Sequence, residues 1–547
     1  MLSAESETVM SRQNRLVPLH EHPLSIFTKE SIYSCDLCQG RNSICAYQCT
    51  ECGYLLHEEC IRGFLNNPSP CGHSLKVSMP NKSPQYANDR CHFSKSHLHS
   101  PFARCTICNI NISMLRMGNQ PPPTIYQPKH HEHTLTLLLR LVTFTCNACG
   151  VEGDRNPYVC LQCNVMVHKD CIEDLPRVIC INRHDHRISH TFHLGQGEGE
   201  WECGVCRKRI DWVYGAFKCS RCPSYAVHSR CATRKEVWDF IELEGVPEEE
   251  EEVEEPYRVI NEKEIVHFSH EEHVLRLDEN NVNLRCQGCV LPINGDPCYK
   301  CVECDFGLHK ACASLPRKKR RLLHNHKLVL QVDDSSGFWC KACRTISNGF
   351  RYKCVDDCDD DVVYDVRCSS ASEPFQHDLH PHPLYWTLER SKRCQACNVE
   401  TKDNILSCTV CDDYALCMGC ATLPRKVKHR CDDHFLSLCQ GVGNASGGNL
   451  WCDICETKTD PNVCYYTCEA CGLSLHLKCV LGDFYYMKVG GTEPNPVIFA
   501  NNGVTRPFCI ACEARCKFPV ILWAAISDLS AGYICSSDCA YRLEDKY

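Results

Sequence analysis

Pairs of cysteines separated by two residues, and a His-x-x-Cys motif that follows them, recur along this 547-residue chain. Successive motifs are 111, 60, 81, 56, 52 and 59 residues apart. The period is therefore about 55–60 residues, with one damaged copy in the first step and an insertion in the third, and the sequence predicts a tandem array of small repeated units. The motif, with substitutions at its first position, occurs at His57/Cys60, His168/Cys171, His228/Cys231, His309/Cys312, Asp365/Cys368, Cys417/Cys420 and His476/Cys479.

Each unit follows nearly the same order of chemical groups. A leading histidine precedes a first Cys-x-x-Cys pair by about twelve residues; a second pair and then the His-x-x-Cys motif follow. Thiolate and imidazole are the preferred ligands of Zn²⁺, which takes four of them at about 2.0–2.3 Å in structural sites. Eight ligands therefore predict two closed zinc sites per unit, with no position left for a reacting water. A unit of this size buries little surface, so metal binding should supply much of its folding free energy.

The candidate zinc ligands can be assigned unit by unit from this order. They are His22, Cys35, Cys38, Cys49, Cys52, His57, Cys60 and Cys71 in the first; His133, Cys146, Cys149, Cys160, Cys163, His168, Cys171 and Cys180 in the third; His190, Cys203, Cys206, Cys219, Cys222, His228, Cys231 and His267 in the fourth; His273, Cys286, Cys289, Cys301, Cys304, His309, Cys312 and His324 in the fifth; His326, Cys340, Cys343, Cys354, Cys358, Asp365 and Cys368 in the sixth; His377, Cys394, Cys397, Cys408, Cys411, Cys417 and Cys420 in the seventh; and His429, Cys452, Cys455, Cys468, Cys471, His476 and Cys479 in the eighth.

Several units depart from the pattern. The second keeps a single pair, Cys105 and Cys108, with Cys91 nearby, and the sequence leaves open whether it binds metal. In the sixth unit Asp365 replaces the motif histidine, and a carboxylate can also bind zinc. In the eighth, Cys468 and Cys471 lack evident partners. After the repeats, Cys509, Cys512, Cys535 and Cys539 predict a separate four-cysteine zinc module of ribbon or treble-clef type.

The expected fold class is therefore a tandem array of small α+β modules stabilised by zinc, with little core beyond the metal sites. An aromatic residue two positions before the third cysteine, and apolar residues alternating before the motif histidine, predict short strands and a miniature core. The expected boundaries are 20–73, a degenerate repeat at 74–125, 130–182, 184–240, an acidic linker at 241–262, 265–322, 324–370, 377–428, 429–482, and 505–547 for the C-terminal module.

The amino-acid composition and charge of the chain argue against membrane-spanning, secreted and nucleic-acid-binding proteins. No apolar run is long enough to span a membrane, and residues 1–20 lack the apolar core of a secretory signal. We therefore expect an intracellular protein, cytoplasmic or nuclear, in which 51 cysteines are metal ligands more often than disulfides. A net charge of −9, which zinc-bound thiolates make more negative, argues against nucleic-acid binding. The basic run Arg317 to Arg321 fits an exposed loop or a nuclear import signal.

The order of ligands resembles the cysteine-rich zinc domain of protein kinase C, and more closely the divergent C-one domains of plant cysteine/histidine-rich proteins. The resemblance is carried by HPHPL around His382, CDFGLHKACASLPRK from Cys304, CATLPRKVKHRCDDHFLSL from Cys420 and ISHTFHLGQGEGEWECGVCRK from Ile188. Spacing alone allows two sequential sites as well, whereas the resemblance implies an interleaved pair. The implied sets are His133, Cys160, Cys163, Cys180 with Cys146, Cys149, His168, Cys171; His273, Cys301, Cys304, His324 with Cys286, Cys289, His309, Cys312; and His190, Cys219, Cys222 completed by His267.

Four functions compete. The first is a non-enzymatic scaffold for protein partners in signalling or stress response, holding on the order of 12–15 zinc ions per chain. Kinase-type relatives bind diacylglycerol through an apolar loop between the two cysteine pairs. Here that loop is short, GVEGDRNPYV after Cys149, which argues against diacylglycerol but leaves other headgroups open. The alternatives are a thiol–disulfide oxidoreductase using Cys-x-x-Cys pairs, a RING- or PHD-like ubiquitin ligase or chromatin reader, and a nucleic-acid binder.

Overall fold

The architecture was examined in a computed structural model of the chain. It describes residues 22–27, 33–37, 41–42, 46–66, 69–78, 90–98, 102–117, 120–195, 200–248, 254–279, 284–332, 337–356, 358, 362–387, 391–401, 403–411, 413–441, 451–460, 462–490, 497–501, 506–527 and 530–544. Cys38, a candidate ligand, lies outside the described residues. The chain divides into two compact units, Met1–Arg177 with His190–Trp201 and Ile210–Lys218, and Val178–Ser189 with Glu202–Arg209 and Cys219–Tyr547.

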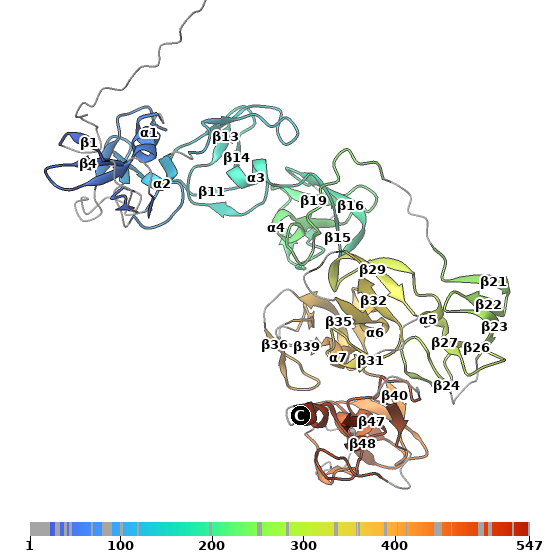
Figure 1. The fold of residues 1–547 in the computed structure, drawn as a ribbon. Helices are drawn as coiled ribbons and strands as arrows, with labels where there is room; N and C mark the ends of the chain where they lie inside the picture. The colour runs from blue at the N-terminus through green and yellow to red at the C-terminus, as the bar shows by residue number, and fades with distance from the viewer. Residues whose placement is uncertain are drawn as a thin grey trace, which may run out of the picture. The chain divides into compact units, whose positions relative to one another are not determined.

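One module pattern recurs, and the seventh repeat shows it completely. A four-stranded antiparallel sheet has the order β34 (Phe375–His377), β35 (His380–Thr387), β38 (Ile405–Cys408), β39 (Ala415–Cys417). A two-stranded hairpin, β36 (Lys392–Arg393) with β37 (Glu400–Thr401), is inserted between the second and third strands. The short helix α7 (Met418–Ala421) follows the last strand directly. Figure 1 shows the same combination of strands and one short helix along the chain.

The first three periods contain the following elements. The first has β1 (Leu24–Phe27), β2 (Tyr33–Ser34), β3 (Arg41–Asn42), β4 (Ala46–Cys49), β5 (Leu55–His57) and α1 (Glu58–Asn66); the second has β6 (Lys76–Ser78), β7 (Phe102–Cys105), β8 (Ile110–Ser113) and α2 (Met114–Met117); the third has β9 (Thr124–Ile125), β10 (Leu135–Leu137), β11 (Phe144–Thr145), β12 (Glu152–Gly153), β13 (Tyr158–Cys160), β14 (Val165–Val167) and α3 (Lys169–Glu173).

The remaining elements continue in the same order. They are β15 (Val178–Ile181), β16 (His184–Thr191), β17 (Trp201–Glu202), β18 (Arg209–Ile210), β19 (Ala216–Cys219), β20 (Ala226–His228) and α4 (Ser229–Ala232); β21 (Tyr257–Asn261), β22 (Glu264–His267), β23 (His270–Asp278), β24 (Leu284–Arg285), β25 (Pro292–Ile293), β26 (Cys298–Cys301), β27 (Gly307–His309) and α5 (Lys310–Ala313); β28 (Lys318–Arg321), β29 (His324–Gln331), β30 (Phe338–Trp339), β31 (Ile346–Ser347), β32 (Arg351–Cys354), β33 (Val363–Asp365) and α6 (Val366–Ser369); β40 (Lys426–Lys428), β41 (Phe435–Cys439), β42 (Trp451–Cys452), β43 (Thr457–Lys458), β44 (Tyr465–Cys468), β45 (Leu473–His476) and α8 (Leu477–Leu481); and β46 (Val497–Ala500), β47 (Val520–Ser527), β48 (Ser530–Ile534) and α9 (Ser537–Glu544).

The predicted class of small strand-rich modules in tandem is confirmed, but their sheets begin earlier than the expected boundaries. The first strand of a module lies within the segment assigned to the preceding one: β15 heads the fourth sheet, β28 the sixth and β40 the eighth. The basic run at Arg317 to Arg321 is consequently an edge strand rather than a loop, since β28 pairs with β29. Two of its cations bind Glu254, with Lys318 Nζ at 2.5 Å and Arg317 at 3.2 Å.

The core is shared between neighbouring modules. One cluster of buried residues runs from Ile265 in the fifth repeat to Ala421 in the seventh and includes Cys464 of the eighth. The first repeat has its own cluster, around Leu24 and Leu56. Adjacent repeats in the second compact unit therefore stabilise one another through apolar contact as well as through their own metal sites.

Candidate metal centres

The first Cys-x-x-Cys pair and the His-x-x-Cys motif form one kind of four-residue group, here called the hairpin site. In the third repeat, the ligand atoms of Cys146, Cys149, His168 and Cys171 all lie within 4.8 Å of one another. The two cysteines occupy the turn between β11 and β12. His168 directly follows β14 and is the N-cap of α3, so Cys171, three residues later in the helix, lies beside it.

A backbone contact fixes this geometry in the same way in successive repeats. The N–H of the motif residue donates to the sulfur of the first cysteine, as from His168 to Cys146 at 3.5 Å and from Asp365 to Cys340 at 3.4 Å. Hydrogen bonds to sulfur favour the thiolate, which is the metal-binding form. The same bond occurs between the pairs His57 and Cys35, His228 and Cys203, His309 and Cys286, and His476 and Cys452.

All hairpin sites follow the assignment expected from spacing. The contacts join Cys203, Cys206, His228 and Cys231; Cys286, Cys289, His309 and Cys312; Cys340, Cys343, Asp365 and Cys368; Cys394, Cys397, Cys417 and Cys420; Cys452, Cys455, His476 and Cys479; and, among the described residues of the first repeat, Cys35, His57 and Cys60.

The second Cys-x-x-Cys pair belongs to a different group, here called the strand site, whose other two ligands lie close together at the beginning of the repeat. In the third repeat it contains His131, His133, Cys160 and Cys163. Residues two apart on an extended chain face the same way, so a His-x-His pair can hold one ion; in the fifth repeat the two histidines are three residues apart. Equivalent groups are His184, His186, Cys219 and Cys222; His270, His273, Cys301 and Cys304; His324, His326, Cys354 and Cys358; His380, His382, Cys408 and Cys411; and Asp432, His434, Cys468 and Cys471.

The interleaved order is thus present, but the expected fourth ligands are replaced. His131 takes the place given to Cys180, and His270 the place given to His324, which instead belongs to the sixth repeat. Cys180 lies among charged side chains that include Arg320 and Asp239, and burial raises the pKa of its thiol. In the first repeat, His22 contacts Glu51 at 3.2 Å, between Cys49 and Cys52 in sequence.

Four other candidate histidines have structural contacts in place of ligand roles. His190 contacts the carbonyl of Ala148 at 2.8 Å through Nε2. His267, His377 and His429 each accept a hydrogen bond at Nδ1 from the backbone N–H two residues later. Burial lowers the pKa of His190, His267 and His429 to about 4, so these rings are neutral. Counting residues back from the first cysteine pair selected a strand-site histidine in the third, fifth and sixth repeats (His133, His273 and His326). It selected a neighbouring histidine in the fourth, seventh and eighth (His190, His377 and His429).

The degenerate second period also brings four ligands together. Cys71, His73, Cys105 and Cys108 form a group, with His73 Nδ1 at 3.1 Å from Cys108 Sγ. Cys71 was expected to complete the first repeat, but it stands just before β6, the first strand of the second sheet.

Of the four hairpin-site positions, the second period has a metal-binding residue type at only one, Cys91. Cys91 is buried and accepts a hydrogen bond from the N–H of Ser113 at 3.3 Å, the same contact that motif residues make elsewhere. Ser94, Ser113 and Arg116 stand where the other three ligands would be. The second period therefore retains a strand site and has lost its hairpin site.

Asp365 fits a metal site despite replacing histidine. Its Oδ2 lies 3.1 Å from Cys343 Sγ and 3.6 Å from Cys368 Sγ, while Oδ1 accepts the N–H of Cys368 and caps α6. The guanidinium of Arg367 is 2.8 Å from Oδ2 and 3.3 Å from the ring centroid of Tyr486. Burial raises the pKa of Asp365, and the neighbouring Arg367 opposes that shift.

The electrostatics of the hairpin sites match metal binding. Hydrogen bonding to Cys146 and Cys149 raises the pKa of His168 to about 9, and Cys203 and Cys206 raise that of His228 to about 10. The raised pKa of each histidine shows that the neighbouring sulfurs carry negative charge. A bound dication would neutralise that charge, and the histidine would release its proton. None of the cysteines that the structure describes is in a disulfide.

The C-terminal cysteines also meet as expected. Cys535 Sγ lies 3.8 Å from that of Cys512 and 3.6 Å from that of Cys539, and Cys509 is hydrogen-bonded within the same group. They join the turn before β47 to the first turn of α9.

Comparison with models of known protein families identifies the family to which the chain belongs. The model of the C1 domain matches residues 18–61, 128–172, 182–232, 268–313, 322–369, 378–421 and 429–480, and that of the C-terminal C1 domain-like module matches 497–540. These matches cover more than half of the chain, which therefore belongs to the C1 domain family. Neither model matches the second period.

No curated protein and no solved structure matches the chain. C1 domains bind zinc, and the donor atoms here suit it: five groups such as Cys146, Cys149, His168 and Cys171, and eleven more, bring at least three ligands within reach of one ion. C1 domains are generally non-catalytic binding modules. Among the described residues, no helix is both long and apolar enough to cross a membrane.

Proposed function

We propose that this protein is a non-enzymatic, zinc-dependent scaffold that binds protein partners through its array of C1 modules. The observation that carries the proposal is the closure of the sites. Both sites of the third repeat have four protein ligands, and structural zinc centres are closed in this way, whereas catalytic ones keep a position for water or substrate.

The main alternative, thiol–disulfide exchange, needs an activated cysteine at the N-terminus of a helix. The first cysteine pairs lie instead on turns between hairpin strands, as Cys394 and Cys397 do between β36 and β37. Thiolates held by zinc are also poor nucleophiles. A binding role accounts for the repetition of these sites, since each module would present a rigid surface.

A pair of experiments on the full chain tests the scaffold. Zinc measured by mass spectrometry should be on the order of 12–15 ions per chain, and a content below about five would contradict the paired sites. Proteins captured from native tissue should be retained by the zinc-loaded chain and lost after chelation. Insulin-disulfide reduction by the zinc-loaded protein, undiminished by added zinc, would favour the oxidoreductase; ubiquitin discharge from a loaded conjugating enzyme would favour a ligase.

A further inference from the structure

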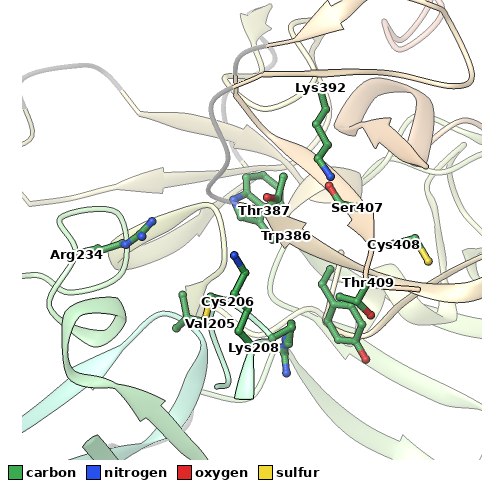
Figure 2. Close-up of a pocket in the computed structure, with 12 residues that line it drawn as sticks. Val205, Cys206, Lys208, Arg234, Trp386, Thr387, Lys392, Ser407, Cys408 and Thr409 are labelled. Atoms are coloured by element: carbon green, nitrogen blue, oxygen red, sulfur yellow. The ribbon is translucent and has the colours of Figure 1, made fainter. Parts of the chain in front are cut away.

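A pocket in the second compact unit lies between a cysteine turn of the fourth repeat and the sheet of the seventh. Its volume is about 350 Å³, near the lower end of the range for small-molecule sites. Figure 2 shows Arg234 and Thr409 on opposite sides of it. Its lining residues are Val205, Cys206, Arg207, Lys208, Arg234, Tyr385, Trp386, Thr387, Lys392, Ser407, Cys408 and Thr409.

The pocket is strongly cationic. Arg207, Lys208, Arg234 and Lys392 line it, and none of the described lining residues is acidic. Among the described residues, Glu373 is a carboxylate that contacts the lining, and its side chain is only 5 % exposed. Its two oxygens are shared between Arg183 and Arg207, each at 2.7 Å, so one negative charge is divided between two guanidinium groups.

The metal sites beside the pocket do not cancel this charge. With zinc bound, the hairpin site of the fourth repeat, which includes Cys206, carries three thiolates against one dication and a net charge of −1. The strand site of the seventh repeat, which includes Cys408, has two thiolates and two imidazoles and is neutral. Among the described residues, the lining therefore carries four cations beside one such charge and a carboxylate that is already paired.

Polar groups in the wall are arranged to receive a ligand. Ser407 is 7 % exposed, and its hydroxyl has no hydrogen-bond partner among the described residues. A buried hydroxyl without a partner is uncommon in folded proteins, and a ligand that reached it would supply one. Thr387 and Thr409 add two more hydroxyls, and Tyr385, with Arg207 4.5 Å from its ring centroid, supplies a flat apolar wall.

We propose that this pocket binds a phosphomonoester, either a free metabolite or the headgroup of a lipid. A phosphate dianion matches several converging cations and hydroxyl donors, and arginine pairs with its oxygens in a bidentate manner. The volume suits a small phosphorylated molecule rather than a nucleic-acid strand. This assignment goes beyond the scaffold function, which does not require it.

The test is isothermal titration calorimetry of the zinc-loaded full chain with glycerol 3-phosphate and with inorganic phosphate. The variant Arg234→Gln/Lys392→Gln removes two lining cations and leaves Arg207 in its buried ion pair. We expect the Kd for glycerol 3-phosphate to rise at least about tenfold, because each charged hydrogen bond lost is worth a comparable factor.

A matched control removes the same two charges elsewhere. Arg258 and Lys263 are exposed residues of the fifth repeat, outside the pocket, and Arg258→Gln/Lys263→Gln should leave the Kd unchanged. Zinc content and circular dichroism should be the same in both variants as in the wild type, as a check that they fold.

A second arm uses phosphatidylcholine vesicles with and without phosphatidic acid. Sedimentation with phosphatidic acid alone, lost in the pocket variant, would identify a lipid headgroup; binding of glycerol 3-phosphate alone would identify a free metabolite. Two results would overturn the proposed phosphomonoester site and leave the scaffold proposal standing. One is an equal Kd for glycerol 3-phosphate in the pocket and control variants; the other is no binding to glycerol 3-phosphate or to phosphatidic acid vesicles.

Discussion

At the scale of single residues, some histidines of this chain lie in the candidate metal sites and others make structural hydrogen bonds, and residue type alone does not distinguish them. His380 and His382 lie with the second cysteine pair, whereas His377, three residues before His380, is half-buried and accepts a backbone N–H. The hairpin sites could be predicted because their ligands lie in turns and in the first helical turn, where spacing determines geometry. Counting identified the strand sites only in part, because strand alternation decides which histidines face the cysteines.

The second period offers a direct test of ligand assignment. Cys105 and Cys91 are both fully buried cysteines of the same module. Cys105→Ser should lower the zinc content by one ion per chain, because it removes a ligand from a complete group. Cys91→Ser should leave the zinc content unchanged, since its former partners are serines and an arginine. Equal zinc content in the two variants, measured by mass spectrometry, would contradict this assignment.

The buried neutral histidines predict an acid-sensitive component of stability. Burial lowers the pKa of His429 to about 4, against about 6.5 for an ordinary histidine. Between these values the unfolded chain binds the proton and the folded chain does not, so this contribution is lost as the pH falls from about 6.5 towards 4.

The variant His429→Asn keeps an acceptor near the position of Nδ1 but does not titrate. Unfolding of the eighth repeat, followed by hydrogen exchange, should depend less steeply on pH in this variant than in the wild type. His193→Asn, at an exposed position, serves as the control. An identical pH dependence in the wild type and His429→Asn would rule out this histidine as a source of the acid sensitivity.

At the scale of elements, the aromatic residue before the third cysteine was predicted to be core, and its burial confirms this. Tyr158, Tyr352 and Tyr466 are fully buried. The structure adds that their hydroxyls donate to proline carbonyls, as Tyr466 does to Pro424 at 2.7 Å. The apolar alternation indicated the strands, but the expected boundaries placed β15, β28 and β40 in the preceding repeats. Those boundaries were counted from the candidate ligands, whereas these strands pair with the following β16, β29 and β41 through short hairpins.

Tyr466→Phe removes the hydroxyl and leaves the buried carbonyl of Pro424 without this donor. The loss should destabilise the eighth repeat by about 1–3 kcal/mol. Faster hydrogen exchange in β44 and β45 would report it. Tyr541→Phe, at a residue that is 55 % exposed, should have no measurable effect; a similar response in both variants would show that the hydrogen bond contributes nothing specific.

At the scale of the whole molecule, the repeats are not equally independent. A tandem array predicts modules that unfold separately, yet the buried cluster running from Ile265 to Ala421 joins the fifth, sixth and seventh repeats. The third repeat belongs to the other compact unit. Loss of one metal should therefore have local effects in the third repeat and wider effects in the seventh.

Equivalent strand-site cysteines allow this comparison. Cys163 lies 3.1 Å from His133, and Cys411 lies 3.3 Å from His382. In Cys163→Ser, faster hydrogen exchange should be confined to the third repeat. In Cys411→Ser, it should extend from the seventh repeat into the sixth and fifth, through their common core. Exchange confined to the seventh repeat would show that the shared cluster does not couple the modules.

The interleaving of the two sites within a module also bears on how zinc is exchanged. In the third repeat one ion would tie residues 131 to 163 and the other residues 146 to 171, so the two closed stretches of chain overlap. When either ion leaves, the other still holds most of the module, and the vacated ligands stay at a high effective concentration around one another. In a module with two sites, we therefore expect one ion to leave and return while the other keeps the vacated ligands near one another.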